Sequence, residues 1–280
     1  MCFFNSQNKR ALEIAKRYGR KSDIVEMARE ILEEQKRERT GELDFQHRGT
    51  ETSPLPPSKG GYEFHGERQS GEVGEMDCFV PRNDGYKEER AVQKAFMCPD
   101  CLIVTHDEQL QVAKWGLVPF WVRNSEQAAS IRKVTANARS ETAFTQASFR
   151  NAIRKRRCIV PSTGFFEYHH EGKEAIPYKI FLPDSEVFSL AGIYEEWITP
   201  ATNEMIRTFA VLTVPANELC GFIHNGGMNP GRMPAILSVE DENTWLSPEL
   251  TEREILALLR PYETSIMDSV ALEKDYLRRA

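Results

Sequence analysis

The sequence predicts an α+β fold, in which a strand-rich core of curled antiparallel or mixed sheets, similar to a sandwich or barrel, is flanked by helices. Short apolar runs separated by polar turns dominate residues 101–214, and runs of this length are typical of strands. Helical patterns occur between them without regular alternation, which disfavours a parallel βαβ architecture. The 280 residues, of which 40% are apolar, suffice for one large core.

The N-terminal part is predicted to be helical and to lead into an insertion. Across residues 7–38, apolar residues recur at helix-like intervals among charges, and Gly19 is expected to divide the stretch into two helices. Residues 40–90 contain the segment Ser-Pro-Leu-Pro-Pro-Ser-Lys-Gly-Gly and few apolar anchors, a composition typical of disorder. We therefore predict one domain over residues 1–280, with an insertion or flexible loop at 40–90.

Strands and helices are predicted in the remainder of the chain. Five apolar runs are expected to form strands, at Cys101–Thr105, Cys158–Pro161, Tyr178–Leu182, Val187–Tyr194 and Thr208–Val214. Three helices are expected, at about Ser148–Lys155, Val239–Leu246 and Glu252–Leu259. Ser238 is a candidate N-cap, and Thr251 with Glu254 has the spacing of a capping box before a stop at Pro261.

Composition favours a cytoplasmic protein that needs no metal or organic cofactor. The sequence has no run of 18 or more apolar residues, and the polar residues after Phe4 do not form a signal-peptide core. The six cysteines lack the density of a disulfide scaffold, so we expect free thiols. Cys98-Pro-Asp-Cys101, followed by His106, resembles half of a zinc site, but no second ligand pair occurs at suitable spacing.

The charge distribution leaves two interpretations open. The chain has a net charge of −6, yet the stretch from Lys114 to Arg157 holds ten basic residues and two acidic ones, a formal charge of +8. Such a run is often a solvated helix face. It also suits a surface for single-stranded nucleic acid, because the interleaved Trp115, Phe120 and Trp121 can stack on bases while basic groups hold phosphates.

Cys2 is the most informative single residue. Removal of Met1 would leave an α-amine, with an ordinary pKa of about 7.7–8.0, and a thiol, with one of about 8.5, on the same residue. Such an aminothiol traps aldehydes: the amine condenses to an imine, and the thiol adds to the imine carbon to close a thiazolidine ring. Taken alone, however, a Cys near a chain terminus is most often a small buried hydrophobe, and without further evidence that interpretation is favoured.

Five motifs, of which the first contains Cys2, follow one another along the chain. They are Met1-Cys2, Trp115-Gly-Leu-Val-Pro-Phe-Trp121, Asn137-Ala-Arg-Ser-Glu141, the segment from Arg157 through Glu167 to Tyr168, and Ile223-His224-Asn225 leading to Arg232-Met-Pro-Ala-Ile-Leu237. In this order they resemble the SOS-response-associated peptidase family. The resemblance implies capture of abasic sites in single-stranded DNA through a covalent crosslink, as part of a DNA-damage response. It covers residues 1–5 and about 96–246, and it does not cover residues 40–90.

The resemblance assigns catalytic roles to four residues. Cys2 matches the nucleophile, Asn137 the asparagine that orients the terminal amine, and Glu167 the glutamate that moves protons during imine formation. His224 matches a histidine before the Arg-Met-Pro segment, and an imidazole both accepts and donates protons near neutral pH. The remaining histidines in this region lack that context and are predicted to be surface residues: His106, His169 and His170.

Five further residues are predicted to contact DNA. Arg139 and Arg232 match positions that hold phosphates, for which a guanidinium fork is well suited. Arg157 belongs to the basic stretch and is expected to contribute there. Phe120 and Trp121 are expected to be exposed beside the flanking bases, whereas Trp115 is expected in the core.

Two departures from the family pattern stand out. Phe3-Phe4 follows the cysteine where the family usually has Gly-Arg, and the seven residues between His224 and Arg232 form a longer spacing than is typical. Two other classes of function stay open beside abasic-site capture with lyase activity. One is a cysteine-type peptidase, including one that processes its own terminus, and the other is a module that binds single-stranded DNA without covalent chemistry.

Overall fold

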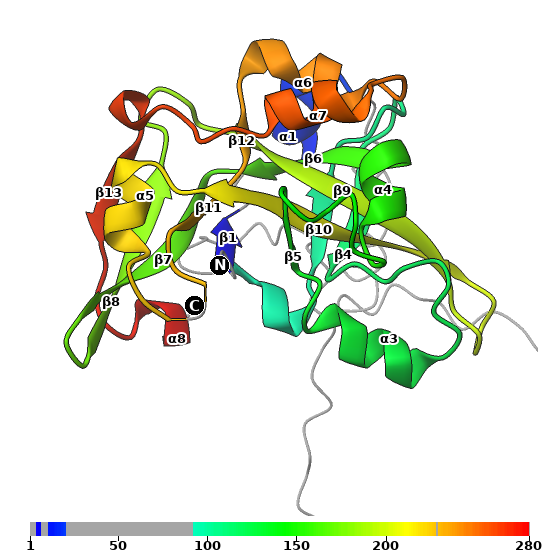
Figure 1. Cartoon of the computed structure of the whole chain (residues 1–280), viewed down its shortest axis with the longest axis horizontal. Coiled ribbons are helices and arrows are strands. Elements are labelled where there is room, and N and C mark those ends of the chain that lie inside the picture. The colour runs from blue at the N-terminus through cyan, green and yellow to red at the C-terminus, as the bar shows by residue number, and fades with distance from the viewer. Residues whose placement is uncertain (1–3, 7–10, 21–91, 228, 280) are drawn as a thin grey trace, which may run out of the picture. The chain divides into compact units, whose positions relative to one another are not determined.

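The computed structural model describes residues 4–6, 11–20, 92–227 and 229–279. Cys2 lies outside these residues, and so do the predicted insertion at 40–90 and most of the helical stretch predicted at 7–38. The single domain over residues 1–280 therefore stays a prediction. The described strands form two sheets with helices beside them (Figure 1). This arrangement confirms the predicted α+β class.

The first sheet is five-stranded and antiparallel throughout, with the order β13–β8–β7–β1–β2. Its strands are β1 (Phe4–Ser6), β2 (Val92–Lys94), β7 (Gly164–Glu171), β8 (Glu174–Phe181) and β13 (Asp268–Ala271). In this sheet Phe4 pairs with Phe166, the residue before Glu167. The N-terminal strand is thus inserted between β7 and β2 instead of lying on an edge.

The second sheet is eight-stranded and mixed. Its strands are β3 (Asp100–Ile103), β4 (Gln111–Trp115), β5 (Asn137–Arg139), β6 (Arg157–Ser162), β9 (Phe188–Ile198), β10 (Met205–Pro215), β11 (Arg232–Pro234) and β12 (Ile236–Leu237). The main path runs β12–β9–β10–β4–β3, with β6 on β9 and both β5 and β11 on β10. The pairings of β10 with β4 and with β5 are parallel, and the others are antiparallel.

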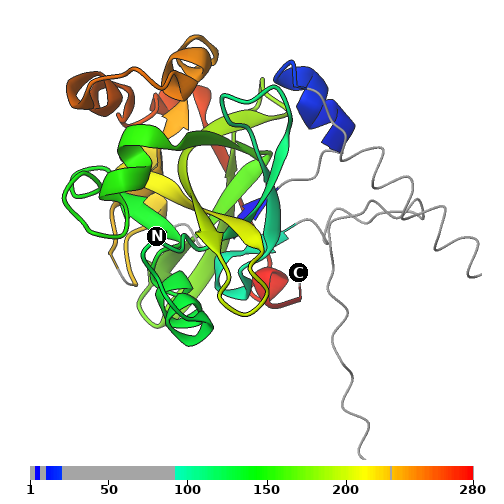
Figure 2. The ribbon, with the colours of Figure 1, turned by 90° about the vertical axis from the view of Figure 1, so that its right-hand side faces the viewer.

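This sheet curls strongly, as the view in Figure 2 shows. Val104, just after β3, forms a single bridge with Ile159 of β6, through backbone hydrogen bonds of 2.9 and 2.8 Å. Because no continuous ladder joins β3 to β6 in the described strands, the sheet is curled but not closed. Only Thr163 separates β6 from β7, so the chain passes there directly from one sheet to the other.

One cluster of buried apolar side chains draws on both sheets. Phe165 and Ile180 of the five-stranded sheet share it with Leu190 and Phe209 of the eight-stranded sheet. Trp245 enters from a helix and is fully buried, with its Nε1 donating to the Cys158 carbonyl at 2.8 Å. The two sheets are therefore held together by one continuous core.

Helices flank the sheets and are fixed by caps and ion pairs. Their bounds are α1 (Ala11–Arg17), α3 (Ser125–Arg132), α4 (Arg150–Lys155), α5 (Glu218–Ile223), α6 (Val239–Leu246), α7 (Glu252–Leu258) and α8 (Tyr276–Arg279), with 3₁₀ turns η2 (Ala95–Met97) and η3 (Thr264–Ile266). Arg17 of α1 forms an ion pair of 2.8 Å with Glu242 of α6. None of the described helices is long and apolar enough to cross a membrane.

The predicted elements agree with the structure, apart from their ends. All five predicted strands are present as β3, β6, β8, β9 and β10. β9 continues past the predicted end at Tyr194 to Ile198, because its register with β10 holds charged residues such as Glu195 in the ladder. Helix α6 starts after the Ser238 cap as predicted, and α7 carries both hydrogen bonds of the capping box. Helix α4 begins two residues later than predicted, at Arg150.

Candidate functional site

The centre of the candidate site is a buried carboxyl beside a buried imidazole. Glu167 is on β7, and His224 directly follows α5. The Glu167 side-chain oxygen Oε2 lies 3.9 Å from His224 Nε2. Both residues are buried, with exposures of 5% and 4%. Two of the four predicted catalytic residues are therefore brought together.

Burial raises the pKa of the Glu167 carboxyl to about 7. The cause is loss of hydration: Glu167 is buried, and so are Phe165 and Phe166, which precede it on β7. A charged carboxylate loses hydration energy there, whereas the neutral acid loses little. At neutral pH the group is thus present in both protonation states, which suits a residue that donates and accepts protons.

His224 is held in a defined tautomer. Its Nδ1 lies 3.0 Å from the backbone carbonyl oxygen of Arg232, and because a carbonyl oxygen only accepts, Nδ1 carries the hydrogen. The other nitrogen, Nε2, faces Glu167. Burial lowers the pKa of His224, with a smaller contribution from the nearby His170. The neutral imidazole therefore presents a lone pair to the carboxyl of Glu167.

The last residues of β10 connect His224 to the Asn-Ala-Arg motif. β5 and β11 lie on opposite edges of this strand, and Thr213 pairs with Arg139 on one side and with Pro234 on the other. Asn137 starts β5, opposite Val211, and is buried. Arg139, at the end of β5, is exposed, and its guanidinium contacts the side-chain oxygen of Asn229.

Arg232 is engaged within the protein. Its guanidinium binds the Glu141 carboxylate through both nitrogens, with Nη2 at 2.9 Å from Oε2, and Nη2 also donates to the Thr213 carbonyl at 2.6 Å. This pairing lowers the pKa of Glu141. A phosphate at Arg232 would share the guanidinium with Glu141. Sequence reasoning did not single out Glu141 beyond its place in the motif, and no local pattern marks it as the partner of an arginine 91 residues away.

Arg157 lies in the interior of the protein. It is 4% exposed, and its guanidinium donates to the backbone carbonyls of Trp245, Ile153 and Arg154 at 2.9 Å each and to that of Ser247. This position does not suit the DNA contact predicted for Arg157, because its donors face backbone oxygens in the interior. The structure instead shows it joining β6 to α4 and to the end of α6.

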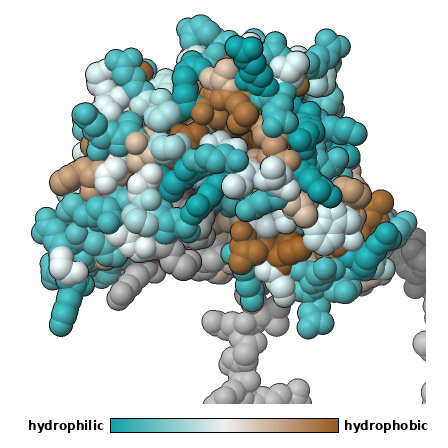
Figure 3. Space-filling model, in the orientation of Figure 1, coloured by the Kyte–Doolittle hydropathy of each residue, from teal (hydrophilic) through white to brown (hydrophobic). Residues whose placement is uncertain are grey.

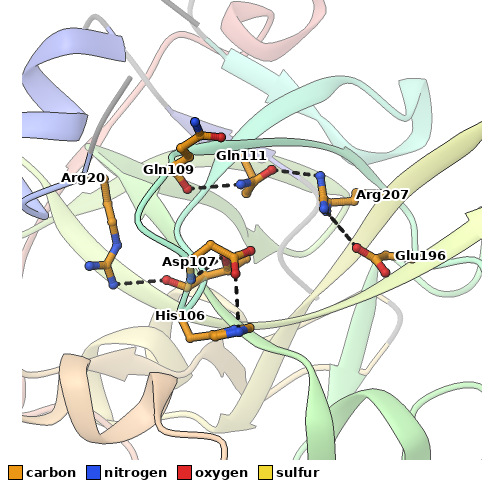
Figure 4. Close-up of polar contacts among 8 residues, drawn as sticks. Arg20, His106, Asp107, Gln109, Gln111, Glu196 and Arg207 are labelled. Carbon is orange, nitrogen blue, oxygen red and sulfur yellow. Dashed lines mark hydrogen bonds and ion pairs between the residues drawn. The ribbon is translucent and has the colours of Figure 1, made fainter. Parts of the chain in front are cut away.

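Part of the positive charge in the stretch from residue 114 to residue 157 is neutralised within the protein. Several of its charges are paired with acidic residues: Lys114 with Asp100 at 2.8 Å, Arg154 with Glu252 at 3.2 Å, and Arg156 with Glu195 at 3.2 Å. Other arginines are paired too, as Figure 4 shows for Arg207 with Glu196. The formal charge counted along the sequence thus overstates the positive charge offered to a ligand.

The aromatic residues divide as the sequence predicts. Phe120 is 59% and Trp121 36% exposed, in the turn that precedes α3. Trp115 is buried, and its Nε1 donates to the Ala136 carbonyl at 2.8 Å. Figure 3 shows apolar atoms exposed close to α3 among mostly hydrophilic surroundings.

The candidate zinc residues lie apart from this site. His106 is exposed and stands beside Asp107, at 3.4 Å, in the polar cluster of Figure 4. Cys101 is buried in β3, which raises the pKa of its thiol, and Cys98 ends the turn η2. Within the described ranges, no group of three or more His, Cys, Asp or Glu side chains is arranged to hold a metal ion.

Two neighbouring histidines belong to the surroundings of the site. His169 was predicted at the surface but is buried, because it stacks on Phe222 with ring centroids 4.5 Å apart and its Nδ1 bonds the Phe222 carbonyl at 2.8 Å. The next residue, His170, is bonded through its backbone to Asn225. Strand alternation identifies His169 as facing the same side as Glu167, a signal that the sequence contained.

Comparison with known proteins identifies the class. The family model "SOS response associated peptidase (SRAP)" matches residues 79–276. The chain therefore belongs to this family, as its motifs indicated.

Relatives and solved structures agree with this assignment. The "Abasic site processing protein YoqW" of Bacillus subtilis is 36% identical over 165 residues, which is 58% of this chain and 69% of that protein. The "Abasic site processing protein HMCES" of Gallus gallus is 32% identical over 171 residues, which is 54% of this chain and 49% of that protein. A crystal structure of a protein from Bacteroides thetaiotaomicron is 37% identical, with a TM-score of 0.75 over 100% of this chain and 95% of that chain.

The Arg157→Met substitution should destabilise the fold without weakening DNA binding per folded molecule. It removes the donors of four backbone carbonyls in the interior, so we expect a loss of roughly 2–5 kcal/mol in the free energy of unfolding. Urea unfolding measures this loss, and Arg150→Met, an exposed arginine of the same helix region, is the control. A variant that is as stable as the wild type but binds DNA more weakly would show that Arg157 contacts DNA.

The Glu167→Gln substitution should stabilise the protein at pH 8 and have little effect at pH 4. The folded-state pKa of Glu167, about 7, lies above its unfolded value, so the stability contributed by the protonated form is lost as the pH rises through 7. The neutral amide avoids this loss, which amounts to at most about 3 kcal/mol. Urea unfolding at both pH values tests it, with the exposed Glu249→Gln as control. An equal effect at both pH values would contradict the raised pKa.

Proposed function

We propose that the protein captures the ring-opened aldehyde of an abasic site in single-stranded DNA through Cys2. The amine of Cys2 attacks the aldehyde carbon, and the resulting carbinolamine loses water to give an imine. The thiol then adds to the imine carbon and its proton is transferred to nitrogen, so that the thiazolidine forms with net loss of one water and no redox change. Membership in a family whose relatives are named abasic site processing proteins supports this function.

The single observation that carries the proposal is the buried pair of Glu167 and His224. Ring opening of the sugar requires protonation of the ring oxygen, and loss of the carbinolamine hydroxyl requires a second proton. A carboxyl with a pKa of about 7 supplies such protons at neutral pH. The lone pair of His224 Nε2, 3.9 Å from the carboxyl, can take them back through the substrate or a water.

Chain connectivity supports the role of Cys2. Phe4 pairs with Phe166, which precedes Glu167 on β7. Two peptide units separate Cys2 from Phe4, so their Cα atoms are within about 7 Å of each other. Position 2 is thus joined by a short segment to the end of β1 that pairs beside Glu167.

The surroundings offer groups for binding and orientation. We assign the amide of Asn137 to the terminal amine and the exposed guanidinium of Arg139 to a phosphate. Arg232, paired with Glu141, is a weaker phosphate contact in this scheme, and Arg157 takes no part. Phe120 and Trp121 provide the exposed aromatic faces on which flanking bases stack.

Mixing the protein with single-stranded DNA that contains one abasic site should give a heat-resistant band on a denaturing gel. The band should require both Cys2 and the abasic site, so Cys2→Ala and an intact-base oligonucleotide should abolish it. Cys98→Ser is the matched control, because Cys98 is a partly exposed thiol outside the site. Mass spectrometry should show loss of Met1 before the reaction and loss of one water in the adduct.

Acetylation of the α-amine separates the three classes of function. Capture needs the free amine, so acetylated protein should bind DNA but form no crosslink. A peptidase that acts through the thiol alone would keep its activity, and a purely non-covalent module would give no band with either protein. Absence of the band from protein shown to lack Met1 would refute capture.

Crosslinking by the wild-type protein should be fastest near neutral pH. The rate rises with pH as the α-amine, with an ordinary pKa of about 7.7–8.0, loses its proton. It falls as the carboxyl of Glu167, with a pKa of about 7, loses the proton that it donates. Glu167→Gln should slow the reaction by about 10²–10⁴-fold and should remove the fall at high pH. Single-turnover rates from pH 5 to pH 9 test this, with Glu249→Gln as control. A wild-type rate that keeps rising to pH 9 would exclude Glu167 as the acid.

A further inference from the structure

The residue after His224 is fastened to β7 by two hydrogen bonds. The side-chain oxygen of Asn225 accepts from the backbone N–H of His170 at 2.8 Å, and its amide nitrogen donates to the His170 carbonyl at 3.1 Å. The side chain of Asn225 thus makes the two backbone hydrogen bonds to His170 that a neighbouring strand would make. Since Glu167 lies three positions earlier on the same strand, the bonds tie the backbone beside His224 to the strand that carries its partner.

A second contact fastens the end of α5 to the same strand. His169 Nδ1 bonds the carbonyl of Phe222, two residues before His224, at 2.8 Å, and the two rings stack. His224 therefore lies between two attachments to successive residues of β7. The attachment through Asn225 is the exposed one, so it can be removed without opening the apolar core.

The loop that follows is closed tightly on itself. The N–H of Gly231 donates to the carbonyl of His224 at 2.8 Å, so the two ends of the loop are held next to each other. Gly226 passes against the ring of His170, where a Cβ atom would lie 2.6 Å from Cδ2. Only a glycine lets the backbone approach this closely. The longer spacing between His224 and Arg232 is thus accommodated without releasing the imidazole.

We propose that Asn225 is a positioning residue that holds His224 Nε2 against Glu167 during aldehyde capture. It contacts neither the reacting atoms nor the carboxyl and acts through the backbone of His224. The proposal rests on the proposed function, because it assigns proton transfer to the His224–Glu167 pair. Without the two bonds to His170, the loop would be held to β7 mainly through Phe222, and His224 would lose its fixed separation from Glu167.

The test compares Asn225→Ala with Asn225→Asp and with Asn243→Ala, a matched control on an exposed face of α6. Aspartate keeps the acceptor for the His170 N–H but loses the donor to its carbonyl. We expect Asn225→Ala to slow crosslinking by about 10–100-fold, because a small misplacement of a catalytic group has this cost, and Asn225→Asp to recover part of the rate. Non-covalent affinity for the same DNA should be unchanged.

A second measurement follows His224 itself, by NMR titration of its ring signals, assigned with His224→Ala. The titratable groups that act on the ring are Glu167, His170 and the N-terminal α-amine. In Asn225→Ala the pKa of His224 should rise toward its ordinary value as the ring becomes hydrated, while Asn243→Ala should titrate like the wild type.

The outcomes separate the two proposals. A slow Asn225→Ala variant with an altered His224 titration supports positioning. A variant that crosslinks and titrates like the wild type overturns it, and so does one that is slow only because its melting temperature falls while His224 titrates normally. If the wild-type protein forms no crosslink, the proposed function fails, yet the titration still decides whether Asn225 fixes His224.

Discussion

The site depends on keeping one carboxyl out of water. Burial of Glu167 on β7 raises its pKa to about 7, and this makes an otherwise charged side chain a proton donor at neutral pH. The same burial costs folding free energy, which the shared core of the two sheets offsets. His224, buried and neutral, adds no positive charge that would bring the carboxyl back to its ordinary pKa.

The crossing between the two sheets explains why the acid lies where it does. Only Thr163 joins β6 to β7, so β7 leaves the eight-stranded sheet directly and carries Glu167 into the five-stranded one. The N-terminal strand pairs with β7 in that sheet, while His224 reaches it from the other sheet through β10 and α5. The N-terminal strand, Glu167 and His224 are thus brought together from three distant parts of the sequence.

Much of the fold was predictable from local signals, whereas the contacts within the site were not. Apolar runs and the capping residues Ser238 and Thr251 are read within a few positions, so they located the strands and helices well. The motifs also named Glu167 and His224. By contrast, the burial of Arg157 and the pairing of Arg232 with Glu141 depend on segments about 90 residues apart. Charge counted along the sequence cannot distinguish a solvated arginine from one bound to backbone carbonyls.

The internal contacts of these arginines affect how a chain with a net charge of −6 can bind DNA, which is itself negatively charged. Non-covalent affinity for DNA grows with the number of phosphates that are neutralised, and several basic groups of the chain are already paired with acidic residues of the protein. Arg139 is held by the uncharged Asn229 and can exchange it for a phosphate, whereas Arg232 would have to share its charge with Glu141. If the proposed capture holds, weak initial binding suits the protein, because its hold on DNA then comes from a covalent bond. In such a protein selectivity arises from the aldehyde, which intact DNA lacks, and not from a large basic surface that would retain undamaged strands.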